Sequence, residues 1–487
     1  MVMKRLVREP RQAHPTLVYA ALSILLLVPC YWQPRLQAGD LSSHIYNAWL
    51  ARLIETGRMQ GLAIATQTTN VLFDLLLGGL YRLLGPEAAQ RIAVSMVVLV
   101  FVWGSFAFVC KVAGHRPWHL LICIAVLAYG WVFHMGFFNF YLSLGLCFWA
   151  LALVWNGCGR RWLLTLPILS LAYLAHGLPV VWTACLLVYL WLAHRLPPRR
   201  HSLLMAASLL TMLLIHWTLS LRLVTHWSPM QIVSSTGADQ VWVFDLKYYC
   251  VMIGLLLIWG LLFLELLHRS GARQVASSMA FQICIVGATG VFIMPTAVLI
   301  PGFHHSLVYI AERMSLGVGI CVCALLGAAR AQAIVRYGLA LVALVFFSFL
   351  FRDERALNSF EDRMEDTVAR LQPGQRVVSG VDDQLIRTFA LAHMIDRACL
   401  GRCFSYGNYE ASTAQFRVRA TAANPFVVFR YGDSIDIQHG NYVVKSSDLP
   451  IYKVDLEDGR LVIRSLQAGI PCGMKFWNTL AGTPPRS

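Results

Sequence analysis

Long apolar stretches, separated by short polar or basic segments, occupy most of the chain up to Phe351. A helix needs about 20 mostly apolar residues to cross a bilayer, so each stretch is interpreted as one membrane-spanning helix. Where a stretch is shorter, its helix must extend into the flanking residues. The pattern predicts about eleven spans. They lie at roughly 16–32, 91–112, 118–133, 140–157, 162–175, 180–194, 201–221, 248–267, 275–300, 314–329 and 334–351.

The longest connection between these stretches, residues 33–90, contains two amphipathic segments. Apolar residues recur at helical spacing in the first segment, 40–57. The second segment, 70–85, carries Asp74 and Arg82 and is too short and too charged for a span. Both are therefore predicted to be helices that lie in the plane of the membrane surface.

The sequence changes character after the last apolar stretch, because charged residues become frequent from Arg352 on. The segment 352–371 is typical of an amphipathic helix. Shorter apolar segments bounded by turn residues then predict strands, and together they indicate a small α+β domain over 352–487. The predicted strands are 376–381, 416–420, 425–432, 441–446, 450–456 and 461–466.

Lysine and arginine are unevenly distributed over the predicted loops. If the N-terminal segment 1–15 is cytoplasmic, every inner loop is basic, and the outer loops after 33–90 contain only Arg222, Lys247 and Arg313. This agrees with the excess of positive charge on cytoplasmic loops. The first stretch ends without a small-residue cleavage site, so we expect an uncleaved span. An odd number of spans then places the C-terminal domain outside the cytoplasm.

Composition supports a membrane protein and argues against nucleic-acid binding. Apolar residues make up 57% of the chain and charged residues 13%, against about 25% in soluble domains. The net charge of +15 comes largely from loop residues that face anionic lipid headgroups, and no basic stripe interleaved with aromatic residues is present. No phosphate-binding glycine motif occurs, which disfavours chemistry driven directly by ATP.

Asp40 is the first candidate for chemistry, because it follows the first span at the outer membrane face. A carboxylate there could accept a proton from a hydroxyl group, or it could simply cap the following helix. His44 lies one helical turn later and could orient the carboxylate or contact a phosphate. The alternative for His44 is an ordinary interfacial histidine.

Three further residues fall in outer turns: His134, Asn139 and His176. They could line a cleft for a lipid or an acceptor, or they could be polar residues of the membrane interface. The three histidines His44, His134 and His176 could also form a zinc site, although their spacing gives no support for a metal. We therefore expect no cofactor.

Arg313 opens a late span beside Glu312. Its guanidinium could bind a phosphate through two hydrogen bonds, or it could pair locally with Glu312. Asp239 and Asp245, in the outer loop 222–247, are additional acidic candidates. Cys399, Cys403 and Cys472 could include a disulfide if the tail is extracytoplasmic, but spacing does not identify the pair.

This layout resembles the GT-C class of membrane glycosyltransferases, which includes the protein mannosyltransferases and the lipid A aminoarabinose transferases. The segment from Gly39 to Gly57 is similar to the acidic motif of their first outer loop, and Val71 to Arg91 is similar to their second interfacial helix. Glu312-Arg313 resembles their late-span arginine, which binds the donor phosphate. The segment that begins at Cys399 resembles tails of bacterial proteins of this type, which implies the bacterial inner membrane.

The resemblance implies that a polyprenyl-phosphate-linked sugar is the donor, that Asp40 is the catalytic base, and that an acceptor hydroxyl of unknown identity receives the sugar outside the cytoplasm. Many members carry a second acidic residue, whereas here Leu41-Ser42 follows Asp40 and the second outer loop offers His134 and Asn139. This departure favours a metal-free mechanism with a single base. The alternative from another class is a non-catalytic assembly or export factor, or a lipid flippase, on the same scaffold.

Overall fold

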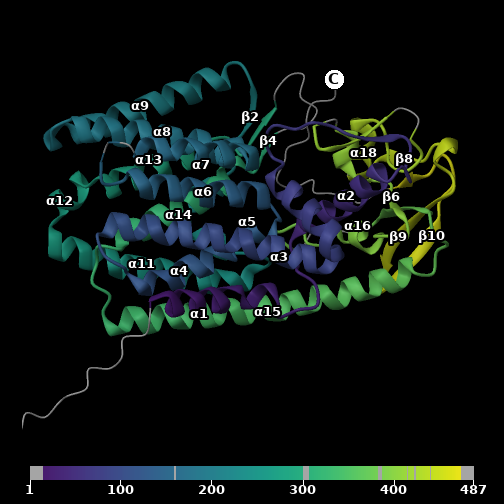
Figure 1. Cartoon of the computed structure of the whole chain (residues 1–487), viewed down its shortest axis with the longest axis horizontal. Helices are drawn as coiled ribbons and strands as arrows, with labels where there is room; N and C mark the ends of the chain where they lie inside the picture. The colour runs from purple at the N-terminus through teal and green to yellow at the C-terminus, as the bar shows by residue number, and fades with distance from the viewer. Residues whose placement is uncertain are drawn as a thin grey trace, which may run out of the picture.

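The computed structural model describes residues 15–157, 159, 161–299, 307–381, 386–413, 415–421, 424–438 and 440–472. Residues 1–14 of the predicted N-terminal segment 1–15 lie outside the described ranges. The protein is mostly helical: apolar helices lie side by side in a bundle, and a part with mixed helices and strands adjoins one end of it (Figure 1). We call the described residues from 369 onward the C-terminal part.

Each predicted apolar stretch contains a helix. The bundle helices are α1 (Pro15–Leu27), α3 (Leu72–Ala113), α4 (Trp118–Ala128), α6 (Phe138–Val154), α7 (Arg161–Ala175), α8 (Gly177–Arg195), α9 (His201–Ser220), α11 (Tyr249–Ser270), α13 (Met279–Ile293), α14 (Ile310–Leu326) and α15 (Ala333–Val368). Within the described ranges, five helical segments are long and apolar enough to cross a membrane: Leu72–Ala113, Gly177–Arg195, Pro198–Ser220, Leu246–Ser270 and Ala333–Val368. The architecture is that of a helical membrane protein.

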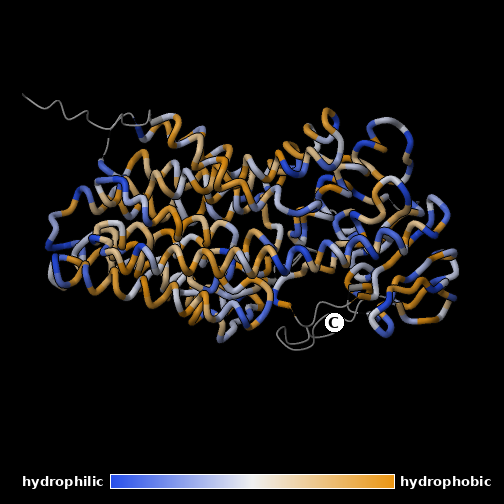
Figure 2. The backbone as a smooth tube through the Cα atoms, turned by 90° about the horizontal axis from the view of Figure 1, so that it is seen from below, coloured by the Kyte–Doolittle hydropathy of each residue, from blue (hydrophilic) through white to orange (hydrophobic). Residues whose placement is uncertain are grey.

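The peripheral helix α9 gives the clearest sign of an apolar surrounding. None of its most apolar 18-residue window is buried inside the protein, and Leu203 and Trp217 are more than 60% exposed. In water so large an apolar surface would not stay uncovered. Figure 2 shows apolar positions along the bundle helices and polar positions in the connections at the end farthest from the C-terminal part. This distribution fits a bundle surrounded by lipid.

One predicted span is wrong at its C-terminal end. Helix α13 stops at Ile293, and Ala297–Leu299 forms strand β3 instead of continuing the helix. Pro295 explains the break, because proline disfavours a helical conformation in the residue before it. Strand β3 lies between β2 (Val224–His226) and β4 (Leu307–Val308) in a three-stranded antiparallel sheet.

The two predicted interfacial helices are both helical. The first is α2 (Gly39–Glu55), which packs against α3 and against α16 (Met394–Ala398) of the C-terminal part. The second is the beginning of α3, which bends at Gly85 (φ 78°) before Pro86 and continues as an apolar helix. A positive φ is accessible to glycine without strain, and proline fits the first turn after such a break.

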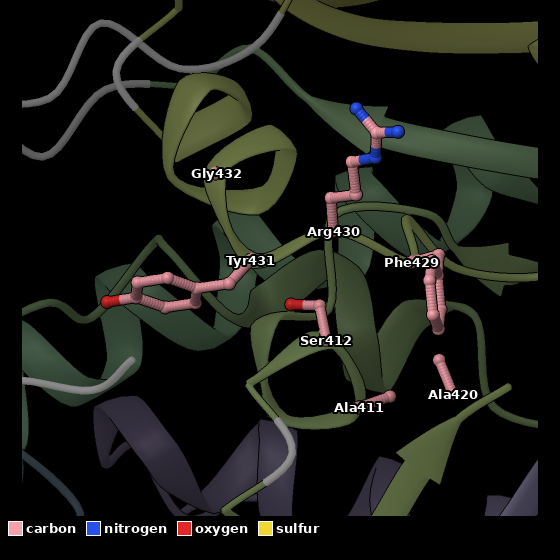
Figure 3. Close-up of a pocket in the computed structure, with 7 residues that line it drawn as sticks. All are labelled: Ala411, Ser412, Ala420, Phe429, Arg430, Tyr431 and Gly432. Atoms are coloured by element: carbon pink, nitrogen blue, oxygen red, sulfur yellow. The ribbon is translucent and has the colours of Figure 1, made fainter. Parts of the chain in front are cut away.

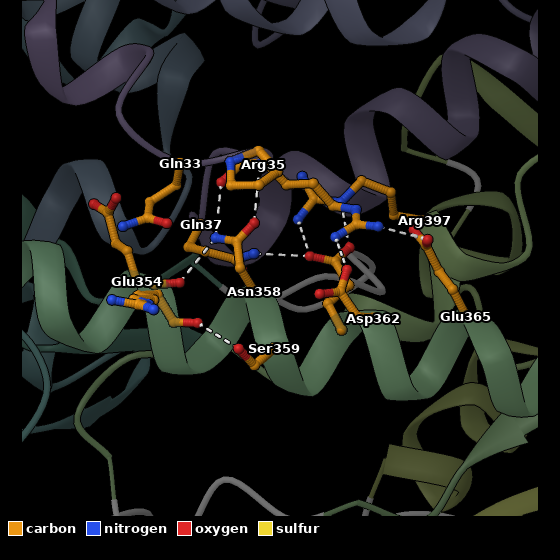
Figure 4. A network of polar contacts seen from close by, with 12 residues as sticks. Gln33, Arg35, Gln37, Glu354, Asn358, Ser359, Asp362, Glu365 and Arg397 are labelled. Carbon is orange, nitrogen blue, oxygen red and sulfur yellow. Dashed lines mark hydrogen bonds and ion pairs between the residues drawn. The ribbon is translucent and has the colours of Figure 1, made fainter.

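Helix α15 connects the bundle to the C-terminal part without interruption (Figure 1). The separate amphipathic helix predicted at 352–371 is therefore the second half of one helix. Its inward face carries Glu354, Asn358 and Glu361, all less than 5% exposed. Asn358 donates to the carbonyl of Arg35, in the connection after α1, at 3.1 Å (Figure 4). Glu361 accepts a hydrogen bond from Arg397 at 2.5 Å.

The C-terminal part contains a four-stranded sheet in the order β10-β9-β5-β6. Strands β9 (Ile451–Glu457) and β10 (Arg460–Ser465) are antiparallel, whereas β5 (Arg376–Ser379) is parallel to β9 and to β6 (Phe404–Ser405). A separate pair joins β1 (Leu62–Ile64), from the long outer loop, to β7 (Val418–Ala420). Strand β8 (Tyr442–Val443) pairs with β11 (Pro471–Cys472). The loop 33–90 is thus tied to the C-terminal part by main-chain hydrogen bonds.

The strand predicted at 425–432 is wrong. The side-chain oxygen of Asn424 accepts hydrogen bonds from the backbone N–H groups of Phe426 and Val427, at 3.0 and 2.9 Å. Those N–H groups are the ones a strand would use for pairing, so this local capture competes with a sheet. Helix α18 (Tyr431–Gln438) begins at the end of the segment.

Candidate functional site

A group of polar and charged side chains gathers where the bundle meets the C-terminal part. The N-terminal turns of α2, α3, α6 and α14 supply Asp40, His44, Asp74, Asn139 and Arg313, with His44 one turn after Asp40. The C-terminal part supplies His393, Asp396 and Glu410, the last from α17 (Tyr409–Ser412). Segments more than 300 positions apart in the sequence therefore form one site.

Asp40 is free of the capping role that the sequence left open. The N-cap residue of α2 is Ala38, and no side chain caps this helix. The backbone N–H of Asp40 donates to the carbonyl of Met135 at 3.0 Å. This close approach depends on Gly136, which has φ 82° and where a Cβ would lie 2.5 Å from the Asp40 nitrogen. The Asp40 side chain remains 19% exposed.

The nearest charged partner of Asp40 comes from the C-terminal part. Nε2 of His393 lies 3.6 Å from Oδ1 of Asp40, and Nδ1 of the same ring lies 3.0 Å from Oδ2 of Asp396. Burial lowers the pKa of His393, but the charges of Asp396, Asp40 and Glu410 outweigh it and raise the pKa to about 9. The ring is therefore an imidazolium at neutral pH.

His44 and Asn139 come together through Asp74. Nδ1 of His44 lies 2.6 Å from one oxygen of Asp74, and the amide of Asn139 donates to the other at 2.8 Å. The Asn139 oxygen accepts from the N–H of Phe73 at 2.8 Å, which fixes the start of α3. Burial disfavours protonation of His44, but Asp74, Glu410 and Asp40 raise its pKa to about 9. His44 thus contacts Asp74 directly and does not bond Asp40.

Glu410 closes the site from the C-terminal part. Its side chain accepts a hydrogen bond from Ser43 at 2.9 Å, and burial raises its pKa. A cavity of about 20 Å³, the space of one water molecule, lies between α2 and this residue. Its polar lining comprises His44, Asn47, Gln67, Asp74, Glu410 and Arg417.

The positively charged guanidinium of Arg313 has no carboxylate partner among the described residues. Its guanidinium lies 3.7 Å from the centre of the Phe137 ring, and its buried Nε has no hydrogen-bond acceptor in the described part of the chain. The local pair with Glu312 is therefore wrong. Among the charged groups around Arg313, the carboxylate of Asp40 acts on it most strongly. A guanidinium placed in this way can receive an anion.

His134 and His176 have structural roles. His134 is fully buried, its Nδ1 donates to the carbonyl of Gly130 at 3.1 Å, and its Nε2 lies 3.1 Å from Glu354 of α15. Nδ1 of His176 caps α8 by accepting from the N–H of Leu178 at 3.1 Å. The zinc site suggested for the three histidines is wrong, since no group of three metal-binding side chains forms within the described ranges.

The additional acidic candidates are also engaged elsewhere. Asp239 is completely buried, accepts hydrogen bonds from Ser234 and Ser315, and pairs with Arg387 at 3.1 Å. Asp245 pairs with Lys247 at 2.9 Å. In the tail, Cys399 is bonded to Cys403, and Cys472 is free.

A larger cavity, of about 420 Å³, opens in the C-terminal part. In the view of Figure 3, Ser412 lies between the rings of Phe429 and Tyr431. Helix α17 connects this cavity with the polar site, because Glu410 faces the site and Ser412 lines the cavity. The volume is within the range of small-molecule binding pockets.

Sequence reasoning found Asp40, His44, Asn139 and Arg313. It noted Asp74 as a charged residue of the second amphipathic segment, and it missed His393, Asp396 and Glu410. Comparisons of the chain with models of known protein families, with curated proteins and with solved structures give no match. A function is therefore inferred from the residues of this site.

Proposed function

We propose that the protein is a membrane glycosyltransferase that moves a sugar from a polyprenyl-phosphate lipid to an acceptor hydroxyl on the extracytoplasmic side. In this proposal about eleven helices cross the bacterial inner membrane, with the N-terminus in the cytoplasm. The arginine-rich connections then lie at the cytoplasmic end, in agreement with the positive-inside rule, and the polar site lies at the outer end.

One observation carries the proposal: a partly exposed carboxylate and an unpaired guanidinium face the same site at one end of an apolar bundle. No hydrogen bond from a described residue reaches the side chain of Asp40, and Arg313 has no carboxylate partner among them. A lipid-linked sugar phosphate needs both groups, an arginine for the phosphate and a base for the attacking hydroxyl. It also needs a lipid-facing bundle that admits its polyprenyl chain.

The proposed reaction is a single displacement. The acceptor oxygen attacks the anomeric carbon while its proton moves to Asp40. The bond between that carbon and the phosphate oxygen breaks, and its electron pair stays on the phosphate. Arg313 stabilises the resulting negative charge. The products are the glycosylated acceptor and the polyprenyl phosphate, and Asp40 returns its proton to water. A displacement of this kind inverts the configuration at the anomeric carbon.

The cavity beside α17 is the proposed place for the acceptor. Its two aromatic rings and the hydroxyl of Ser412 offer stacking and hydrogen bonding to a polar molecule. Glu410, which precedes Ser412 in α17, connects this cavity to the site of Asp40.

The test is sugar transfer from radiolabelled polyprenyl-phosphate sugars in membranes that contain the native protein or Asp40→Asn at equal abundance. Asp366→Asn, an exposed carboxylate of α15 outside the site, is the matched control. We expect transfer with the native protein and the control, and its loss in Asp40→Asn. If the native protein transfers no sugar from a full range of donors, the non-catalytic assembly or flippase function replaces this proposal.

A further inference from the structure

A histidine from the C-terminal part stands between two carboxylates, one of which is the proposed base. The chain of contacts runs from Asp396 through the ring of His393 to Asp40, over 3.0 and 3.6 Å. We propose that His393 and Asp396 are positioning residues through which the C-terminal part completes the catalytic site. This inference rests on the proposed function of Asp40.

The geometry fixes which atom of Asp40 is available. Asp396 is 2% exposed and accepts the Nδ1 proton of His393, which sets the orientation of the imidazole ring. The other nitrogen then faces Oδ1 of Asp40. Oδ2 of Asp40 remains for the acceptor hydroxyl, because no hydrogen bond from a described residue reaches it. A carboxylate held in this way does not have to reorient when the acceptor arrives.

The charges around His393 come from several elements. Asp40 of α2, Asp396 of α16 and Glu410 of α17 all act on it, and the ring of Tyr409 packs against it at 5.5 Å. Arg313 of α14 acts on Asp40 from the bundle. With three carboxylates around it, His393 stays protonated well above neutral pH. This positive charge attracts the carboxylate of Asp40 and helps to hold it in place.

His134 provides an internal comparison. Both nitrogens of its ring make hydrogen bonds, but the ring is completely buried and its carboxylate partner, Glu354, is 2% exposed. The side chains of His393 and Asp40 are 15% and 19% exposed. The pair around His134 serves packing, whereas the pair around His393 is open to a small molecule.

The kinetic test uses His393→Gln and Asp396→Asn, with the exposed residues His115 and Asp366 as controls, changed to Gln and Asn. We expect kcat to fall about tenfold or more in both His393→Gln and Asp396→Asn, with little change in the KM for the donor. Native kcat in both variants, or a fall in kcat that is matched by a rise in the KM for the donor, would mean a merely structural role and would overturn the proposal.

A second measurement does not depend on activity. Magnetic resonance of the full-length protein with ring-labelled histidine, assigned through His393→Gln, follows the protonation of His393 directly. We expect its pKa to be about 9 in the native protein and lower in both Asp40→Asn and Asp396→Asn. If the pKa of His393 is near 6.5 and does not change in Asp40→Asn, the proposed coupling of Asp396, His393 and Asp40 does not exist. If this coupling is observed in a protein that transfers no sugar, only the proposed function fails.

Discussion

At the scale of single residues, neighbours in space decide between the alternatives that the sequence leaves open. Glu312 and Arg313 suggest a local ion pair, but consecutive residues of a helix point in different directions and do not face each other. Arg313 instead contacts Phe137, and among the charged groups around it Asp40 acts on it most strongly. Asp40 opens α2 without capping it. Both residues are thereby left available to a ligand.

Arg313 is expected to bind the donor phosphate. Arg313→Gln should raise the KM for the lipid donor by a factor that corresponds to about 2 kcal/mol, since a charge-assisted hydrogen bond is lost. The KM of Arg313→Lys should lie between those of Arg313→Gln and the native protein, because lysine keeps the charge but lacks the planar guanidinium group. Steady-state kinetics with saturating acceptor measures this effect. An unchanged KM in Arg313→Gln would place the phosphate elsewhere.

The pair of His44 and Asp74 makes stability depend on pH. The pKa of His44 in the folded protein, about 9, exceeds its ordinary value of 6.5. Its contribution, on the order of 2 kcal/mol, is therefore complete below pH 6.5 and is lost as the pH rises through 9. Thermal unfolding in detergent should show His44→Gln to be destabilised at pH 6 and similar to the native protein at pH 10. A difference in stability between His44→Gln and the native protein that stays constant with pH would contradict this role of His44.

At the scale of elements, hydrophobic periodicity predicts where helices lie better than where they end. The change from apolar to charged residues near Arg352 suggests a new helix, yet no glycine or proline interrupts the chain between Gly338 and Pro373, and α15 continues through it. The change in composition therefore does not mark the start of a new helix. The strand predicted at 425–432 fails because Asn424 takes the N–H groups that a sheet would need.

A buried ion pair attaches α16 to α15. Arg397 donates to both oxygens of Glu361, at 2.5 and 2.7 Å, and to the carbonyl of Leu36 at 3.0 Å. Glu361→Gln should lower the free energy of unfolding by about 3–5 kcal/mol, because the buried guanidinium loses its counter-charge. Denaturant or thermal unfolding in detergent measures this.

The neighbouring residue Asp362 is the matched control for Glu361. Its side chain is 60% exposed and pairs with Arg35 at 2.6 Å. Asp362→Asn should change the free energy of unfolding by less than about 1 kcal/mol, since exposed ion pairs contribute little. Equal destabilisation by the two variants would mean that the pair of Glu361 and Arg397 does not hold α16.

At the scale of the whole molecule, the sequence predicted a helical membrane protein and four residues of the candidate site. It could not predict His393, Asp396 or Glu410, because no local motif marks them and only the packing of the tail on the bundle brings them to Asp40. Glu410 follows the disulfide-bonded Cys399 and Cys403 in the tail, but nothing in the sequence relates that segment to Asp40. Sites assembled from distant segments require the tertiary structure.

The proposed orientation can be tested by labelling with a maleimide that does not cross membranes. In a background with the exposed Cys185 and Cys250 changed to Ser, Lys445→Cys should react on intact spheroplasts. Arg195→Cys, at the other end of the bundle, should react only after the membrane is permeabilised. The opposite pattern would place the candidate site in the cytoplasm and exclude an extracytoplasmic acceptor.

The central claim is that Asp40 acts as the base on a lipid-linked sugar held by the same site. The most direct measurement compares donor binding and sugar transfer in purified Asp40→Asn and native protein, both in lipid nanodiscs. We predict that the variant binds the polyprenyl-phosphate sugar about as tightly as the native protein and transfers it at least about a hundredfold more slowly. Transfer by Asp40→Asn at the native rate would contradict the account.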